Sequence, residues 1–313
     1  MKSNNQITKE QLHFGWDNSL EPALVIDPGS VIEVDTLDAG GGQLDRNSSL
    51  EDVSKFDFSK VNPTFGPVYV NGAEPGDALK ISVLDLKLAG WGWTANIPGF
   101  GLLADQFTEP ALHIWDFDPL CKEPAVFKPG GKVPLKPFPG IMGNALPDPG
   151  CHSVVNPRMY GGNMDTRDMG VGTEILLPVG VQGALFSCGD GHAAQGDGEI
   201  CGTAIEAPMV MTLKLDLVKN ANLRFPQFST KGPVTHHFDA AGYDVTMAMG
   251  EDLMQCAKDC VSDMVSEISA KHNMAPVDAY MLASVCADLR ISEIVDAPNW
   301  IISCYFPRLV FEL

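Results

Sequence analysis

The chain is poor in basic residues. Its 313 residues include 21 lysines and arginines against 40 aspartates and glutamates, which gives a formal net charge of −19. Binding to nucleic acid or to an anionic membrane needs a basic surface. No run approaches the roughly 20 apolar residues of a membrane-spanning helix, and residues 1–10 lack the apolar stretch of a signal peptide. We therefore predict a cytoplasmic protein that binds neither nucleic acid nor a membrane.

Paired cysteine motifs and nucleotide-binding loops are also absent from the sequence. None of the eight cysteines forms a CxxC pair, and without a secretion signal we expect most of them to be reduced and buried. The glycine run at residues 39–42 (AGGG) lacks the strand–turn–helix context of a nucleotide-binding loop. The pattern therefore indicates neither a disulfide framework nor a nucleotide site.

Glycine and proline are plentiful, with 31 and 23 residues, and 45% of the chain is hydrophobic. Residues 27–30 (DPGS) and 74–77 (EPGD) each precede an apolar run, and in such turns proline presets φ while glycine supplies a positive φ. These repeated turn–strand units predict a β-sandwich or β-barrel body. The predicted strands span residues 31–34, 66–70, 78–83, 174–178, 184–187 and 209–217.

The last third of the chain has a different pattern. Apolar residues recur at helical spacing over 251–271, and a second helix is predicted from Pro276 to about residue 289. Residues 245–249 and 300–310 are predicted strands. The fold class is therefore mainly β, with a β-rich body over 1–225 and a two-helix α+β segment over 226–313. Residues 91–149 show little periodicity and are predicted to form long ordered loops.

The most informative segment is residues 186–206 (FSCGDGHAAQGDGEICGTAIE), which concentrates acidic, amide, histidine and cysteine side chains among glycines. It is predicted to be neither a regular helix nor, because apolar residues are few, a buried strand. Glycines let the backbone turn so that polar side chains converge. Histidine with aspartate and glutamate suits a zinc or mixed oxygen–nitrogen metal site. A solvated acidic turn explains the composition equally well.

Two further regions contribute candidate residues. Asn163 and Asp165 are two residues apart, so on an extended segment they face the same way, as a ligand pair or as a plain Asx-turn. His13 and Asp38 flank the first predicted strand and are candidate substrate contacts. The adjacent residues 236 and 237 are both histidines. We expect an exposed pair and not a metal site, because neighbours on a strand point to opposite faces and cannot bind one ion together.

Seven segments, which together run nearly from end to end, resemble the acetamidase/formamidase family. Several of these motifs are long and rare, which makes the resemblance specific. The segments are residues 13–19 (HFGWDNS), 66–77 (GPVYVNGAEPGD), 98–103 (PGFGLL), 137–143 (PFPGIMG), 161–165 (GGNMD), 189–199 (GDGHAAQGDGE) and 296–300 (DAPNW). The resemblance implies a β-rich fold and hydrolysis of short aliphatic amides, such as formamide or acetamide, to a carboxylate and ammonia. It also implies a homo-oligomer, for which we expect a dimer.

Amide hydrolysis needs a nucleophile, a polarised carbonyl and a proton for the departing amine. In the first scheme a divalent ion, Zn²⁺ or Ca²⁺, activates water. Glu199 then takes the proton, and Gln195 and Asn163 hold the substrate or a ligand water. The candidate ligands are Asp165, Asp190, His192, Asp197 and Glu206.

Other schemes remain open at this point. Cys201 is a candidate nucleophile that Glu199 or His192 would activate, because a thiolate near a base can attack an amide. A serine amidase is disfavoured, since the Gly/Ser-rich segment with a supporting lysine is missing. The chain is also compatible with a binding protein that does not hydrolyse amides, and with a Ca²⁺ ion that only holds the loop together.

Overall fold

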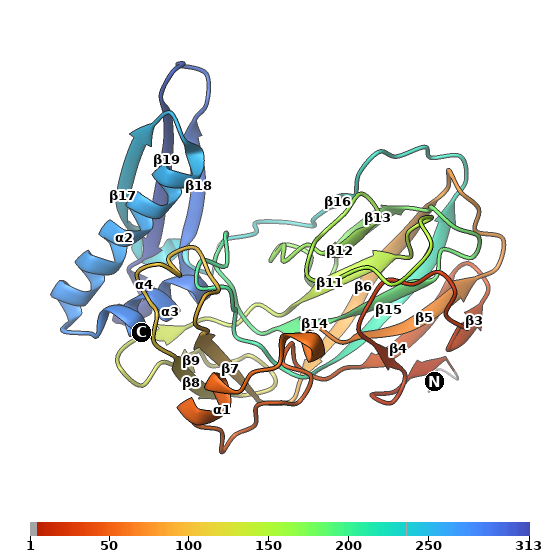
Figure 1. Cartoon of the computed structure of the whole chain (residues 1–313), viewed down its shortest axis with the longest axis horizontal. Helices are drawn as coiled ribbons and strands as arrows, with labels where there is room; N and C mark the ends of the chain where they lie inside the picture. Colours follow the sequence, from red (N-terminus) through yellow and green to blue (C-terminus); the bar gives the residue numbers. More distant parts are fainter. Residues whose placement is uncertain (1–4, 236) are drawn as a thin grey trace.

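Two six-stranded sheets form the larger part of the molecule in a computed structural model that describes residues 5–235 and 237–313 (Figure 1). The first sheet has the order β1 (Gln6–Ile7), β4 (Ser30–Asp35), β15 (Met209–Val218), β6 (Ala78–Leu88), β13 (Glu174–Pro178), β16 (Gln227–Ser229). The second has the order β12 (Gly161–Asn163), β11 (Phe138–Asn144), β14 (Phe186–His192), β5 (Thr64–Val70), β2 (Leu12–His13), with β3 (Leu24–Ile26) also paired to β5.

The predicted alternation of β15 is confirmed and explains how the sheets pack. Met209, Met211, Leu213 and Leu215 are buried, while the residues between them are half-buried. Side chains from both sheets, among them Leu213 of β15 and Phe186 of β14, belong to one continuous hydrophobic core. The described strands form a sandwich-like body and no closed barrel. The mainly β fold class is therefore confirmed.

The turn–strand units are also confirmed. The turn at residues 27–30 leads directly into β4 and the turn at residues 74–77 into β6. Gly29 and Gly76 have φ values of 84° and 95°, a region that an L side chain rarely adopts. These two glycines reverse the chain before each strand.

The prediction of long loops over residues 91–149 is wrong. This stretch contains a two-stranded ladder of β7 (Trp91–Asn96) with β8 (Ala111–Asp116), and a small pair of β9 (Ala125–Val126) with β10 (Lys132–Val133). It also contains β11. The strands escaped prediction because β7 is buried on both faces after its first residue, which removes the alternation that marks a strand. The short α1 (Leu50–Ser54) and η1 (Phe58–Lys60) precede this region.

The C-terminal segment forms a three-stranded sheet of order β17 (Tyr243–Gly250), β19 (Trp300–Pro307), β18 (Asp288–Glu293). It stands at one end of the molecule, in blue in Figure 1, with α2 (Leu253–His272) packed along it. The first helix matches its prediction closely. The second, α3 (Pro276–Cys286), ends before residue 289, because the chain has already entered β18 there. The last predicted strand stops at Pro307 and is followed by α4 (Leu309–Glu312).

Several expectations are not settled by these elements. The division into 1–225 and 226–313 stays a prediction. Residues 1–4 and His236 lie outside the described part of the chain, so the expected exposure of the two adjacent histidines is tested for His237 alone. His237 is half-buried beside η2 (Asp239–Ala241), so that expectation is wrong for it. No helix among the described residues is both long and apolar enough to cross a membrane.

Candidate active site

The strand β14 carries the centre of the site. All seven of its residues are buried, so the expectation that this segment could not form a buried strand is wrong. The strand lies between β11 and β5, and at two of its positions there is no room for a side chain. A Cβ at Gly189 would lie 2.5 Å from the carbonyl oxygen of Pro63, and one at Gly191 would lie 2.6 Å from that of Ala207. This segment can therefore be a buried strand although it has few apolar residues, because its glycines have no side chain to collide with the neighbouring backbone.

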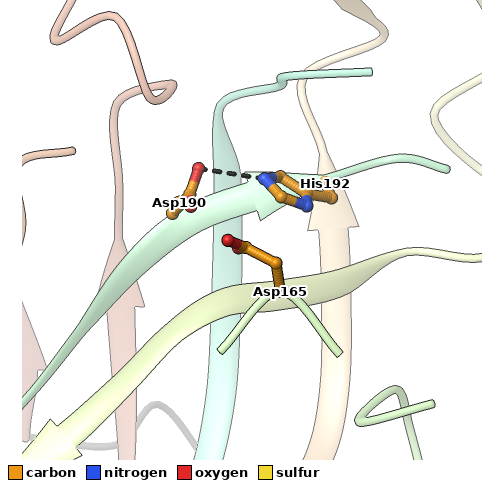
Figure 2. Close-up of side chains that lie close together, drawn as sticks. All are labelled: Asp165, Asp190 and His192. Carbon is orange, nitrogen blue, oxygen red and sulfur yellow. Dashed lines mark hydrogen bonds and ion pairs between the residues drawn. The ribbon is translucent and has the colours of Figure 1, made fainter. Parts of the chain in front are cut away.

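His192, at the end of β14, faces three carboxylates through its Nε2 atom. Nε2 lies 3.1 Å from Oδ1 of Asp190, 3.1 Å from Oε2 of Glu206 and 4.0 Å from Oε1 of Glu199. Asp165, on the loop that follows β12, approaches the same group (Figure 2). Four acidic side chains from three segments of the chain thus surround one imidazole.

Gln195 sets the orientation of that imidazole. The side-chain Nε2 of Gln195 donates to the carbonyl oxygen of Asp165 at 2.7 Å, so its Oε1 is the acceptor that lies 2.8 Å from Nδ1 of His192. Nδ1 therefore carries a proton and donates it to Gln195. In the neutral ring this leaves the lone pair on Nε2, directed at the carboxylates.

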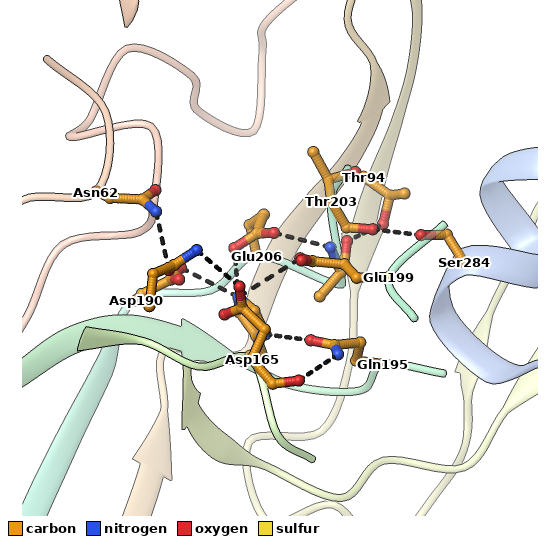
Figure 3. Close-up of polar contacts among 12 residues, drawn as sticks. Asn62, Thr94, Asp165, Asp190, Gln195, Glu199, Thr203, Glu206 and Ser284 are labelled. Atoms are coloured by element: carbon orange, nitrogen blue, oxygen red, sulfur yellow. Dashed lines mark hydrogen bonds and ion pairs between the residues drawn. The ribbon is translucent and has the colours of Figure 1, made fainter. Parts of the chain in front are cut away.

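A chain of amides holds Asp165 in place (Figure 3). Nδ2 of Asn163 donates to Oδ2 of Asp165 at 2.7 Å, and Nδ2 of Asn62 donates to Oδ1 of Asn163 at 3.1 Å. The two-residue spacing of Asn163 and Asp165 does bring their side chains together. Oε1 of Glu206 is fixed separately, since it accepts from the backbone N–H of Ala204 at 2.8 Å.

The backbone is unusual at three of these carboxylates. Asp165, Asp190 and Glu199 have φ values of 43°, 57° and 44°. Such conformations are uncommon for residues other than glycine, and they concentrate at functional sites, where the surrounding structure enforces them. Gly140 of β11 lies against the same group, because a Cβ there would be 2.6 Å from both Oδ1 of Asp165 and Oδ2 of Asp190.

The electrostatics of the cluster favour added positive charge. Burial, with a further contribution from Asp190, raises the pKa of the Asp165 carboxyl well above its ordinary value. Burial also raises the pKa of Glu199 well above its usual range and that of Glu206 to about 7. For His192, burial lowers the pKa, but the carboxylates of Glu206 and Asp190 outweigh this effect and raise it well above the ordinary value.

These residues fit a divalent cation. Oδ1 of Asp165 has no hydrogen-bond partner among the described residues, although it is buried. Oε2 of Glu206 is close to His192 but not at hydrogen-bonding geometry. A buried polar atom without a hydrogen bond lowers the stability of the folded protein by about 1–3 kcal/mol. His192 belongs to two groups of possible ligands, one with Asp165 and Asp190 and one with Glu199 and Glu206, and within each group the ligand atoms lie within 4.8 Å of one another. One imidazole nitrogen with two carboxylate oxygens is a ligand set that Zn²⁺ accepts.

A cavity of about 180 Å³ opens onto the cluster. Its polar lining includes all four carboxylates together with Asn62, Asn163 and Thr203. The remainder is largely apolar and aromatic, and includes Trp93 of β7. A small pocket with a few convergent polar groups is the usual form of a small-molecule site. The arrangement can therefore hold a small polar molecule against the carboxylates.

Four of the residues singled out from the sequence lie away from this cluster. Asp197 is half-exposed and 3.3 Å from Nε of Arg167, which is itself paired with Asp288. His13 contacts Ser187 at 2.9 Å and the carbonyl oxygen of Gly15 at 2.7 Å. Neither Asp197 nor His13 lines the cavity.

The other two are Asp38 and Cys201. Asp38 is buried and accepts from Nε1 of Trp93 at 3.0 Å, so it positions a cavity wall without lining the cavity. Cys201 is fully buried, and its Sγ contacts oxygens of Thr203 and Ala95. Burial raises the pKa of the Cys201 thiol to about 11, which leaves it protonated near neutral pH. This geometry does not favour Cys201 as a nucleophile.

Sequence reasoning missed several residues of the site. Gly140 and Asn62 approach it from β11 and from the segment before β5. Gly140 falls within the motif at residues 137–143, but nothing in that motif marks it as a site residue, and Asn62 stands in no pattern that marks it. Phe56, Phe58 and Thr203 line the cavity. The spacing of Phe56 and Phe58 by two residues in a polar segment is a weak signal, because exposed aromatic pairs are uncommon outside binding surfaces.

Comparison with known proteins identifies a family and several relatives. The model of the Acetamidase/Formamidase family matches residues 1–150 and 148–313. The chain is 27% identical over 371 residues to a formamidase of Methylophilus methylotrophus, covering 96% of this chain and 90% of that one. It is 29% identical over 269 residues to an acetamidase of Mycolicibacterium smegmatis, covering 66% of each.

Solved structures show the same relationship. A gamma lactamase from Delftia acidovorans superposes with a TM-score of 0.88 at 26% identity, covering 99% of this chain and 90% of that one. An acetamidase from Bacillus halodurans superposes with a TM-score of 0.67 at 30% identity, covering 98% of each chain. The β-rich sandwich is thus a fold that this chain shares with amide hydrolases. The chain belongs to the acetamidase/formamidase family.

Proposed function

We propose that the chain hydrolyses short amides to a carboxylate and ammonia in the cavity beside His192. The observation that carries the proposal is the buried group of four carboxylates around one imidazole, in a member of this family, at the wall of a cavity of about 180 Å³. Such a group combines a cation-binding set with a carboxylate free to move protons, which are the two requirements of hydrolysis by activated water.

We propose that Asp165, Asp190, His192 and Glu206 hold a divalent ion. We favour Zn²⁺ over Ca²⁺, because an imidazole nitrogen is a good ligand for zinc whereas calcium is bound by oxygens. When bound, the ion supplies a Lewis acid that polarises the amide carbonyl and lowers the pKa of water. Asp197 is not part of this set, because it pairs with Arg167.

Glu199 is the proposed proton carrier. It lines the cavity, and its burial raises the pKa of the carboxyl, which brings it nearer to the pKa of a proton carrier that works at neutral pH. It accepts a proton from the attacking water and donates it to the nitrogen as the C–N bond breaks. Asn163 also lines the cavity, and we propose that the second N–H of its amide hydrogen-bonds the substrate.

The test is ammonia release from formamide and acetamide by purified protein, as isolated, after EDTA, and after addition of Zn²⁺ or Ca²⁺. We expect activity to disappear with EDTA and to return with zinc. Activity that EDTA leaves untouched would remove the cation from the proposal, and no ammonia under any condition would overturn the proposed function itself.

We also propose that the protein works as a cytoplasmic homo-oligomer. The support is a row of apolar side chains on β17, where Val245, Met247 and Met249 are 41%, 50% and 62% exposed. An apolar row of this kind on a sheet face is typical of an interface. Light scattering coupled to size exclusion measures the mass directly, and we expect twice that of the 33.6 kDa chain.

A further inference from the structure

Four aromatic rings form a continuous wall on the apolar side of the cavity. Phe56 lies 5.8 Å from Trp93 and 5.9 Å from Phe58, and Phe58 lies 5.7 Å from Phe100, all as ring-centroid distances. Each pair is edge-to-face, the arrangement that aromatic quadrupoles favour. All four rings line the cavity.

The outer two rings are poorly explained by folding alone. Phe58 is 48% exposed and Phe100 is 37% exposed, so neither completes a hydrophobic core. They come from different segments, η1 and the loop after β7, and they meet at the cavity. Single exposed apolar residues are ordinary, whereas a group gathered around a pocket indicates a ligand surface.

The inner ring, by contrast, is fixed. Trp93 is 1% exposed and donates through Nε1 to the buried Asp38 at 3.0 Å. Its ring therefore cannot turn away to enlarge or close the space. Aliphatic side chains of Val61, Ile97 and Val155 complete the apolar lining.

The cavity is larger than the smallest amides need. A water molecule takes up about 30 Å³ of liquid volume, and a dry apolar cavity of about 150 Å³ holds a benzene ring. Formamide has three heavy atoms, so it would fill roughly half of the 180 Å³ at most. Unfilled apolar space adds no binding energy, and a ring-sized group would fill it.

The polar and apolar linings fix how such a molecule would lie. The reacting end of an amide substrate would lie against the carboxylates of Asp165, Asp190 and Glu206, and its other end would lie against the four rings. Since the reacting end of an amide is its carbonyl and nitrogen, the substituent on the carbonyl carbon must lie against the rings. A neutral substituent is favoured, because the carboxylates repel a negative charge and the apolar lining offers no partner to a charged group.

We propose that this enzyme selects neutral amides with a compact aromatic or cyclic acyl group, such as benzamide, over formamide and acetamide. This inference rests on the proposed function. Phe58 and Phe100 are the residues that determine the preference, since each would face the acyl ring. Burial of added apolar carbon in a hydrophobic pocket is worth about 10–200-fold in kcat/KM per methylene-sized group.

The experiment compares kcat/KM for formamide, acetamide, isobutyramide and benzamide. For the unsubstituted protein we expect kcat/KM to rise along this series, with benzamide at least tenfold above formamide. In Phe58→Ala and Phe100→Ala the ratio of the benzamide value to the formamide value should fall at least tenfold. Phe225→Ala, which removes a 53% exposed ring outside the cavity, is the matched control and should leave both values unchanged.

A second measurement avoids turnover. Benzyl alcohol, which has the ring but no amide, should inhibit formamide hydrolysis competitively, and the inhibition should weaken in Phe58→Ala. Formamide hydrolysis with no gain for benzamide and no inhibition by benzyl alcohol would overturn this inference and leave the proposed function standing. If none of the four amides is hydrolysed, the proposed function fails first.

Discussion

Oε1 of Gln195 lies 2.8 Å from Nδ1 of His192 and holds the proton of the ring on that nitrogen. The other nitrogen, Nε2, is thereby left facing Asp190 and Glu206, each at 3.1 Å. One amide, three residues along the chain from the histidine, decides which ring nitrogen is available to a cation. The proposed binding of a divalent ion depends on that choice.

The first prediction concerns Gln195. Gln195→Leu removes the acceptor for Nδ1 and the donor to the carbonyl oxygen of Asp165. Loss of such an orienting group typically costs 10–100-fold in metal affinity, so we expect the Kd for Zn²⁺ to rise by that factor. Calorimetric titration measures it. The exposed Gln227 on β16 provides the control Gln227→Leu, and an unchanged Kd in Gln195→Leu would remove Gln195 from the site.

The second prediction separates proton transfer from ion binding. Glu199→Gln preserves shape but cannot carry a proton, so we expect kcat to fall 10²–10⁴-fold. Zinc content should stay near that of the unsubstituted protein, because Glu199 is the most distant of the three carboxylates around Nε2, at 4.0 Å. Glu267→Gln, on the exposed side of α2, is the control. Parallel loss of zinc and activity would instead identify Glu199 as a ligand.

The third prediction uses a glycine that sequence reasoning passed over. In Gly140→Ala the new methyl group would lie 2.6 Å from oxygens of Asp165 and Asp190, a distance that forces both carboxylates to move. We expect loss of zinc binding and at least a hundredfold loss of kcat/KM, with the circular dichroism spectrum retained. Gly232→Ala is the control, since no described atom lies within 4 Å of its Cβ position. Full zinc content in Gly140→Ala would contradict the proposed ligand set.

The fourth prediction tests the cysteine alternative. Cys201→Ala should keep kcat within about threefold, because burial raises the pKa of this thiol to about 11 and little thiolate exists near neutral pH. The free energy of unfolding should fall by about 1–2 kcal/mol, as for loss of a well-packed buried side chain. Urea unfolding and ammonia release measure the two quantities. A folded Cys201→Ala protein with kcat reduced a hundredfold would favour the cysteine mechanism over activation of water by a cation.

The fifth prediction concerns stability in acid. His113 is buried, with its ring 4.5 Å from that of Trp115 and 4.4 Å from that of Phe127, and burial lowers its pKa to about 4. Between this value and the unfolded value of about 6.5, the unfolded chain binds more protons than the folded one. The contribution of His113 to the free energy of unfolding is therefore fully present above about pH 6.5. It declines as the pH falls toward 4, by up to about 3 kcal/mol.

His113→Phe keeps an aromatic ring and removes the titration. Urea unfolding of both proteins at pH 7.5 and pH 4.5 isolates the effect, because the other titrating groups are common to the two. We expect the stability of the unsubstituted protein to drop more than that of the variant between these pH values. An equal decrease in the free energy of unfolding of the two proteins would show that His113 does not contribute to the pH dependence of stability.

Local patterns in the sequence were enough for many elements and for part of the site. The alternation of residues 209–217 predicted β15, and the helical spacing after residue 251 predicted α2. The glycine-rich segment gave Asp190, His192, Gln195 and Glu199 because they are close along the chain. Asn62 and Gly140 could not be found in this way, since each reaches the site only through the pairing of strands distant in sequence.

The sequence by itself determined the family, the mainly β fold class and the residue types of the site. These depend on long motifs, on alternation and on turn chemistry, which are local. Only the tertiary structure decided that β14 is buried, that Asp197 turns to Arg167 and that Cys201 is enclosed away from the cavity. The physical reason is that burial, charge pairing and the pKa of a group depend on neighbours brought together by folding, and neighbours along the chain do not specify them.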